Sequence, residues 1–170
     1  MKDLFASIVV PTIAATLSPA EERQLISWAR LAARCRSPIE RDNYTREIEL
    51  IPDPEAPVRL AQILLRLFTG MLAIGVSRMD AWKHIKKIAF DCMPAIRCRV
   101  LQFLIYSKTP DRPTSDIATA LDYPTETAKR ALEDLTAHGI LNRTSQGRGK
   151  ADLWRLSSLA STLLNTSALS

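Results

Sequence analysis

The sequence is poor in glycine and cysteine, and these two shortages exclude several classes of protein. It contains only five glycines and three cysteines in 170 residues. It has no Gly-x-x-x-x-Gly-Lys-Ser/Thr loop, so it lacks the backbone cradle with which P-loop ATPases hold phosphates. The odd cysteine count excludes a fully paired disulfide framework, and no cysteine pair has zinc-ligand spacing. We expect Cys35, Cys92 and Cys98 to be free core thiols, with no metal and no bound cofactor.

The sequence also lacks an apolar run long enough to span a membrane. The candidate run, residues 4–17, is interrupted by Pro11 and preceded by Asp3. A spanning helix needs about 20 apolar residues, and an acid is out of place in the basic start of a signal peptide. We therefore expect a buried strand or helix here, in a cytoplasmic protein with no membrane partner.

The sequence does contain a regular spacing of apolar residues. Hydrophobic residues make up 46% of the chain, and over long stretches they recur at the intervals that place them on one face of a helix. We predict a mostly α-helical protein, of one domain or two small ones. The formal net charge of +5 and the pI of about 9.4 are compatible with a polyanionic partner.

Local signals divide the first half into helices. A Ser-x-x-Glu capping box at Ser18 predicts a helix over residues 18–34. Residues 39–55 alternate apolar and charged side chains, which predicts a short half-exposed strand or hairpin that ends in a proline-rich connector. Two further helices are expected, over residues 58–74 and from Ser77 onward. The lysines of the second of these, Lys83, Lys86 and Lys87, are interpreted as a solvated face.

A proline at position 94 marks the expected boundary between a helical domain, residues 1–92, and a second domain, residues 93–170. The second domain has the order helix, helix, helix, strand, strand. Its helices are predicted over residues 95–106, from an N-cap at Thr114, and from a cap at Thr125 to His138. Two strands flank a polar, glycine-containing tip at residues 144–150. Residues 157–170 are expected to be a weak helix or a frayed tail.

This order resembles the winged-helix family across residues 94–156. Three segments carry the resemblance: residues 113–118, residues 124–132, and Gly139-Ile140-Leu141 before the hairpin. The resemblance implies a winged helix-turn-helix fold whose job is to bind duplex DNA. In such folds the third helix enters the major groove and its N-terminal half meets base edges.

The helical wheel and the wing suggest which side chains would meet DNA. Arg130 is expected to read guanine and Lys129 to contact phosphate. Thr125 would contact the DNA backbone if its hydroxyl is not already hydrogen-bonded as the N-cap of the helix. Glu126 is better explained as a favourable charge at a helix start than as a base reader. The full candidate set is Thr125, Glu126, Thr127, Lys129, Arg130, Arg143, Arg148 and Lys150.

A protein-docking module with no nucleic-acid role is the alternative. Many winged helices bind proteins, and Glu133 and Asp134 weaken the positive field of the third helix. The docking surface would include the run at residues 4–17 and the C-terminal leucines, if these are exposed as one patch. The partner would be an ATPase core or a second copy of the chain.

A second resemblance concerns residues 18–90. Residues 57–61 and 79–82 look like the helical lid of AAA-plus ATPases, notably the MCM-like replicative helicases, in which a winged helix often follows the lid. The resemblance implies that Arg59 touches a nucleotide phosphate. Without a P-loop, however, we expect the chain to bind no ATP. It would be a fragment, a split product or a stand-alone descendant of such an ATPase, or its partner.

We expect no enzyme activity from the chain itself. It has no nucleophile elbow, no metal motif and no defensible Ser/His/Asp arrangement. The two histidines, His84 and His138, are interpreted as a surface residue and a helix-end residue.

Overall fold

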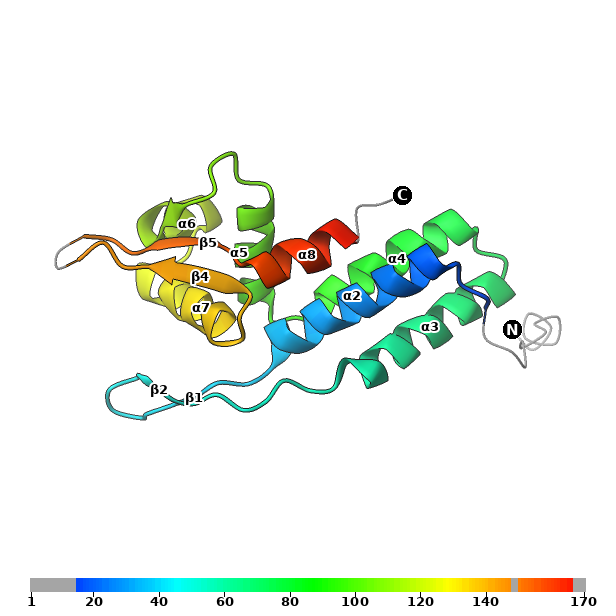
Figure 1. Cartoon of the computed structure of the whole chain (residues 1–170), viewed down its shortest axis with the longest axis horizontal. Coiled ribbons are helices and arrows are strands. Elements are labelled where there is room, and N and C mark those ends of the chain that lie inside the picture. Colours follow the sequence, from blue (N-terminus) through cyan, green and yellow to red (C-terminus); the bar gives the residue numbers. More distant parts are fainter. Residues whose placement is uncertain (1–14, 148–149, 167–170) are drawn as a thin grey trace.

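A computed structural model describes residues 15–147 and 150–166 (Figure 1). Its helices are α2 (Pro19–Arg36), α3 (Pro57–Ala73), α4 (Arg78–Asp91), α5 (Ala95–Ile105), α6 (Thr114–Leu121), α7 (Thr125–Ala137) and α8 (Ser158–Thr166). Its strands are β1 (Glu40–Arg41), β2 (Ile48–Leu50), β3 (Arg112–Pro113), β4 (Leu141–Thr144) and β5 (Leu153–Leu156). The prediction of a mostly α protein with a small β-hairpin is confirmed.

Helices α2, α3 and α4 pack side by side in the N-terminal half (Figure 1). The predicted capping box is present, since the Glu21 N–H donates to the Ser18 hydroxyl and the Ser18 N–H donates to the Glu21 carboxylate. The rings of Trp28 and Phe68 lie 5.1 and 5.2 Å from that of Trp82, so aromatic packing joins the three helices. The apolar side chains of α3 are only partly buried: Leu60, Leu64 and Phe68 lie in the core, whereas Ile63 and Leu67 are exposed.

The C-terminal half contains α5, α6, α7 and a three-stranded antiparallel sheet in the order β3-β5-β4. The predicted hairpin of β4 and β5 is present, whereas β3 was not predicted, because two residues are too few to show a periodicity. The predicted N-caps at Thr114 and Thr125 are wrong. Both helices begin at the threonine itself, with a proline in the capping position and no side-chain cap bond. The Thr114 hydroxyl instead accepts a 2.8 Å hydrogen bond from the buried indole of Trp154.

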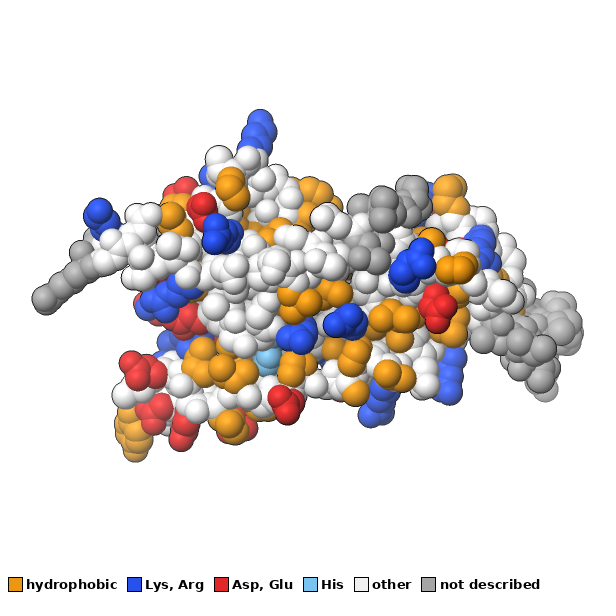
Figure 2. Space-filling view, viewed as in Figure 1, with side chains coloured by type: hydrophobic (Ala, Val, Ile, Leu, Met, Phe, Trp, Pro, Cys, Tyr) orange, Lys and Arg blue, Asp and Glu red, His pale blue; other side chains and the backbone are white. Residues whose placement is uncertain are grey.

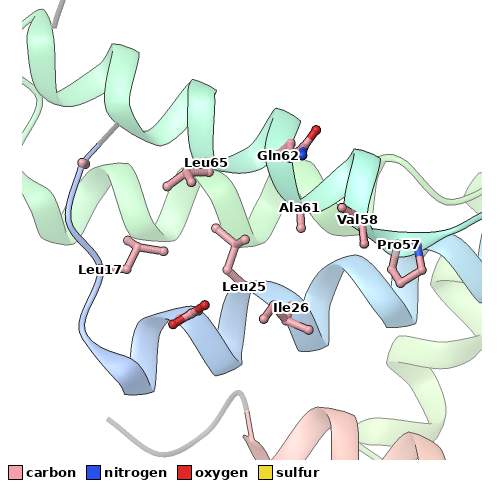
Figure 3. Close-up of a pocket in the computed structure, with 10 residues that line it drawn as sticks. Leu17, Leu25, Ile26, Pro57, Val58, Ala61, Gln62 and Leu65 are labelled. Carbon is pink, nitrogen blue, oxygen red and sulfur yellow. The ribbon is translucent and has the colours of Figure 1, made fainter. Parts of the chain in front are cut away.

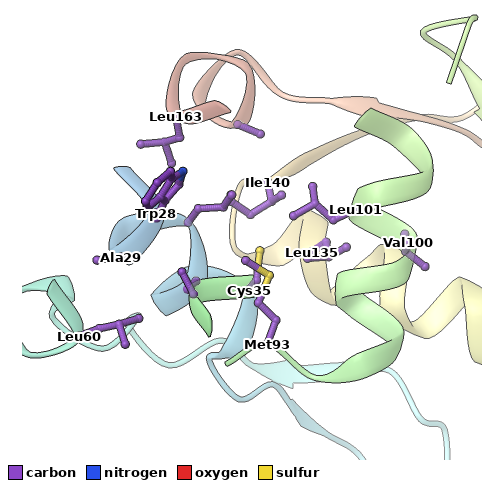
Figure 4. Close-up of a cluster of buried hydrophobic side chains, with 14 of the residues drawn as sticks. Trp28, Ala29, Cys35, Leu60, Met93, Val100, Leu101, Leu135, Ile140 and Leu163 are labelled. Carbon is purple, nitrogen blue, oxygen red and sulfur yellow. The ribbon is translucent and has the colours of Figure 1, made fainter. Parts of the chain in front are cut away.

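The C-terminal segment is a helix that packs on α2. Leu163 of α8 is buried with Trp28 of α2, Leu101 of α5 and Ile140, which follows α7 (Figure 4). Buried side chains from both sides of residue 93 therefore form one cluster. The division into domains of residues 1–92 and 93–170 stays a prediction.

The N-terminal apolar run lies outside the described residues as far as residue 14. Of its remainder, Ala15 donates its N–H to the Thr69 hydroxyl at 2.9 Å. Within the described part of the chain, no helix is both long enough and apolar enough to cross a membrane.

Candidate nucleic-acid interface

The turn between α6 and α7 sets the direction of the candidate recognition helix. Asp122 adopts a left-handed conformation with φ of 56°, and the next N–H, of Tyr123, returns to the Ala118 carbonyl at 3.0 Å. This bonding ends α6 in one step. Pro124 then cannot continue a helix from the preceding turn but suits the start of the next one. Residues 122–124 thus form a tight turn that joins α6 to α7.

One face of α7 is buried and the opposite face is open. Ala128, Ala131, Leu132 and Leu135 pack into the core, and their i, i+3, i+4 and i+7 spacing places them on one side of the helix. The open face carries the candidate side chains: Thr125, Glu126, Thr127 and Arg130 are exposed, and Lys129 is half-buried. Because the Thr125 hydroxyl makes no cap bond, the condition for its contact with a DNA backbone is met.

A groove of about 730 Å³ lies along this open face. It is bordered on one side by the wing, β4 and β5, and on the other by the β1–β2 hairpin, which extend on either side of α7 (Figure 1). The structure brings four of the candidate residues together in this groove: Glu126, Lys129, Arg130 and Arg143. Thr125, Thr127 and Lys150 are not among its lining residues.

The basic side chains of the wing differ in whether they are paired with an acid. The Arg143 guanidinium pairs with Asp152 at 2.6 Å and lies 5.5 Å from the centre of the Trp154 ring. Lys150 is exposed, and the tip is closed by Gly147, whose φ of +95° favours glycine. The candidate residue Arg148 lies outside the described residues.

The acids on α7 are engaged by arginines from elsewhere in the chain. Arg41 of the hairpin donates to Asp134 at 2.6 Å and to Glu133 at 3.0 Å. Arg97 of α5 binds the other carboxylate oxygen of Asp134 at 2.8 Å. The interpretation of these two acids as weakening the positive field therefore needs correction, because much of their charge is balanced internally. No local signal could reveal this, since Arg41 is 92 and 93 residues away from its partners.

A polar joint connects α2 to the end of α7 and includes His138. His138 follows α7, as predicted for a helix-end residue, but it is buried. The Nε2 atom of His138 lies 3.2 Å from both the Ser37 and the Pro38 carbonyl oxygens. The Arg34 guanidinium donates to the backbone carbonyl of His138 at 3.0 Å. Two carbonyl neighbours require a hydrogen on Nε2, which a neutral ring supplies. Burial lowers the pKa of His138 below its ordinary value of 6.5, and the positive charge of Arg97 acts in the same direction.

This joint predicts a pH dependence of stability. Because the folded pKa of His138 is below 6.5, the unfolded chain binds more protons as the pH falls past that value. The contribution of this group is therefore fully present above pH 6.5 and is lost as the pH falls toward the folded pKa. We expect the free energy of unfolding of His138→Gln, measured by urea titration at several pH values, to decline less over this window than that of the wild type. His84→Gln, at an exposed position, should keep the wild-type decline; identical profiles for His138→Gln and wild type would contradict the prediction.

Other candidate chemistry is sparse among the described residues. All three cysteines are free thiols, but only Cys35 is buried in the core as predicted, whereas Cys92 and Cys98 are half-buried. Burial raises the pKa of the Cys35 thiol to about 12, so it is unreactive. In the part of the chain that the structure describes, no cluster of three or more His, Cys, Asp or Glu side chains could hold a metal. Arg59 is exposed in the first turn of α3, and its nucleotide role stays a prediction.

A family model matches part of the chain. The family model described as FaeA-like protein matches residues 97–158, which is less than half of the chain. No curated protein and no solved structure matches. The matched segment runs from α5 through the wing to the first residue of α8. Over that segment the chain is similar to a family of winged-helix-type DNA-binding regulators.

Proposed function

We propose that the chain binds duplex DNA through α7 and the wing. The observation that best supports DNA binding is that Lys129 and Arg130 of α7 line the same groove as Arg143 of the wing. This is the face that a winged helix presents to DNA. Arg130 is exposed and makes no side-chain ion pair among the described residues. A free guanidinium can donate two parallel hydrogen bonds to guanine.

The wing extends this surface and would contact phosphates. Lys150, between β4 and β5, and Arg155, in β5, are exposed on the wing and have no ion-pair partner among the described residues. Such contacts position a protein on the duplex but carry no sequence information. The proposed binding is therefore weakly sequence-specific or nonspecific, with Arg130 as the main source of any preference.

The salt dependence of binding tests this function. If about four basic side chains contact phosphates, the logarithm of affinity should fall with the logarithm of salt concentration with a slope of about −3.6. Fluorescence anisotropy with a labelled duplex, between about 50 and 200 mM salt, gives this slope. Absence of binding by the wild type and by every variant tested, or an affinity that ignores salt, would contradict the proposal.

Protein docking is the second candidate function, and one feature favours it. An apolar groove of about 440 Å³ lies between α2 and α3, lined by Leu17, Leu25, Ile26, Val58 and Leu65 among others (Figure 3). The surface anticipated from the C-terminal leucines is not present, because Leu163 is buried and Leu159 and Leu164 are half-buried. A module that only docks onto an ATPase core or a second copy would give no DNA signal in the salt titration.

The cellular context is a separate part of the proposal. Residues 18–90, which resemble an AAA-plus lid, contain α2, α3 and α4. On this resemblance alone, the chain would act as the DNA-binding accessory part beside an ATPase that supplies its own P-loop.

A further inference from the structure

The hairpin beside α7 carries the wrong charge for a DNA-binding surface. Residues 40–55 contain two arginines and the acidic side chains Glu40, Asp42, Glu47, Glu49, Asp53 and Glu55. One of the two arginines, Arg41, is already paired with Glu133 and Asp134 of α7. The segment therefore presents mainly negative charge, and Figure 2 shows acidic side chains gathered at this end of the molecule.

The hairpin occupies one side of the approach to α7. Arg46, Glu47 and Ile48 line the same groove as Lys129 and Arg130. The major groove of DNA is about 12 Å wide and admits a helix with little to spare, and phosphates flank it on both sides. A duplex seated on α7 with the hairpin in this position would bring phosphates up against the hairpin, whose groove-lining side chains include both Arg46 and Glu47.

The hairpin is held in place by polar contacts with almost no buried apolar surface. None of residues 40–56 is buried, and the side chains of Tyr44, Leu50 and Ile51 are exposed. Its two strands pair at only two positions, and prolines border the segment at both ends. The main anchor to α7 is Arg41, which binds Asp134, Glu133 and, at 3.4 Å, the Arg130 carbonyl. Segments with so little buried area open at low cost in free energy.

From these observations we infer that the β1–β2 hairpin is an autoinhibitory strap, which competes with duplex DNA for α7 and is released when Arg41 leaves Glu133 and Asp134. This inference rests on the proposed DNA-binding function and adds its regulation. With the strap in place, the hairpin occupies one side of the groove, to which it contributes Arg41, Arg46 and Glu47. Its six acidic side chains outnumber its two arginines, so the net charge of the segment opposes the approach of phosphates. With the strap released, the groove side of Lys129 and Arg130 becomes open to the duplex.

Two charge-matched variants test the strap. Glu47→Gln/Glu49→Gln removes two negative charges from the strap at exposed positions. Glu22→Gln/Asp91→Asn removes the same charge from exposed positions on α2 and α4, outside the groove on α7. At about 0.1 M salt the Debye length is about 10 Å, so the effect of a charge is mostly local. We expect the strap variant to bind a labelled duplex about three- to tenfold more tightly than the wild type, and the control to change far less.

A third variant tests whether release of the hairpin from α7 increases the affinity for DNA. Arg41→Gln removes a positive charge and uncouples Glu133 and Asp134, which for a simple DNA-contacting surface would weaken binding. The strap instead predicts a gain in affinity, because the hairpin loses its anchor. Equal gains for the strap variant and its control, or a loss of affinity in Arg41→Gln, would overturn the strap while leaving DNA binding intact. Absence of salt-dependent binding in the wild type and in every variant would overturn the proposed function and the strap with it.

Discussion

Replacing Arg130 by alanine is expected to weaken binding to the preferred duplex by about 1–3 kcal/mol, roughly five- to 150-fold, and to flatten the differences between duplexes. Arg130 is exposed on the open face of α7, where its guanidinium has no side-chain ion-pair partner among the described residues. A bidentate contact to guanine would be lost, whereas contacts to phosphate would remain. Anisotropy measured on a panel of duplexes that differ at single base pairs resolves the two effects.

Lys150 provides the matched comparison for Arg130. It is exposed beside the wing tip, where a basic side chain meets phosphates and no base edge. Lys150→Ala should therefore weaken all duplexes alike and reduce the steepness of the salt dependence by about one unit. Lys83→Ala, on α4, should leave binding unchanged because its ammonium is paired with Asp80 and does not line the groove. If Arg130→Ala weakened every duplex equally, α7 would be a phosphate-binding helix and would not read sequence.

Replacing Arg97 by methionine is expected to lower the free energy of unfolding by about 3–5 kcal/mol. Arg97 is only 9% exposed, and its guanidinium donates to the carbonyls of Cys35 and Ser37, at 3.0 and 2.7 Å, as well as to Asp134. Methionine fills a similar volume but leaves the buried Cys35 carbonyl without its guanidinium donor. The Ser37 carbonyl and Asp134 would keep only their contacts with His138 and Arg41, and the loss of buried charge-assisted bonds costs far more than the loss of an exposed ion pair. The joint between α2 and the C-terminal half depends on these bonds.

Urea unfolding followed by tryptophan fluorescence and by circular dichroism measures the effect of Arg97→Met. Tryptophans report from both halves, since Trp28 and Trp82 lie in the N-terminal helices and Trp154 in the wing. Arg23→Met, at an exposed position on α2, should change stability by less than about 0.5 kcal/mol. A cost for Arg97→Met no larger than that of this control would show that the joint contributes little to stability.

The helices could be predicted from the sequence because their signals are local. Each of these signals involves residues only a few positions apart in the sequence. Examples are the capping box at Ser18, the cap at Ser77 and the apolar stripe of α7. The same holds for the wing tip, where Gly147 takes a left-handed conformation. For the same reason the open face of α7, and with it most of the candidate site, follows from periodicity once its core face is known.

Two threonines show where local reasoning fails. Thr114 and Thr125 have the residue type of a good N-cap, but a proline takes the capping position before each of them. The hydroxyl of Thr114 is then used by Trp154, which is 40 residues away. A propensity for a residue type describes an average environment, and a specific tertiary partner overrides it.

By itself, the sequence determined the order and type of the main helices, the helix-turn-helix pair with its hairpin, and which α7 side chains are open. Tertiary structure alone decided that β3 joins the sheet, that α8 packs on α2, and that the acidic hairpin lies against α7. Helix signals arise from bonds between residues three or four apart, so they can be read along the chain. Arg41 meets Asp134 across 93 residues and Arg34 meets His138 across 104, and contacts at such separations depend on how the helices pack in space.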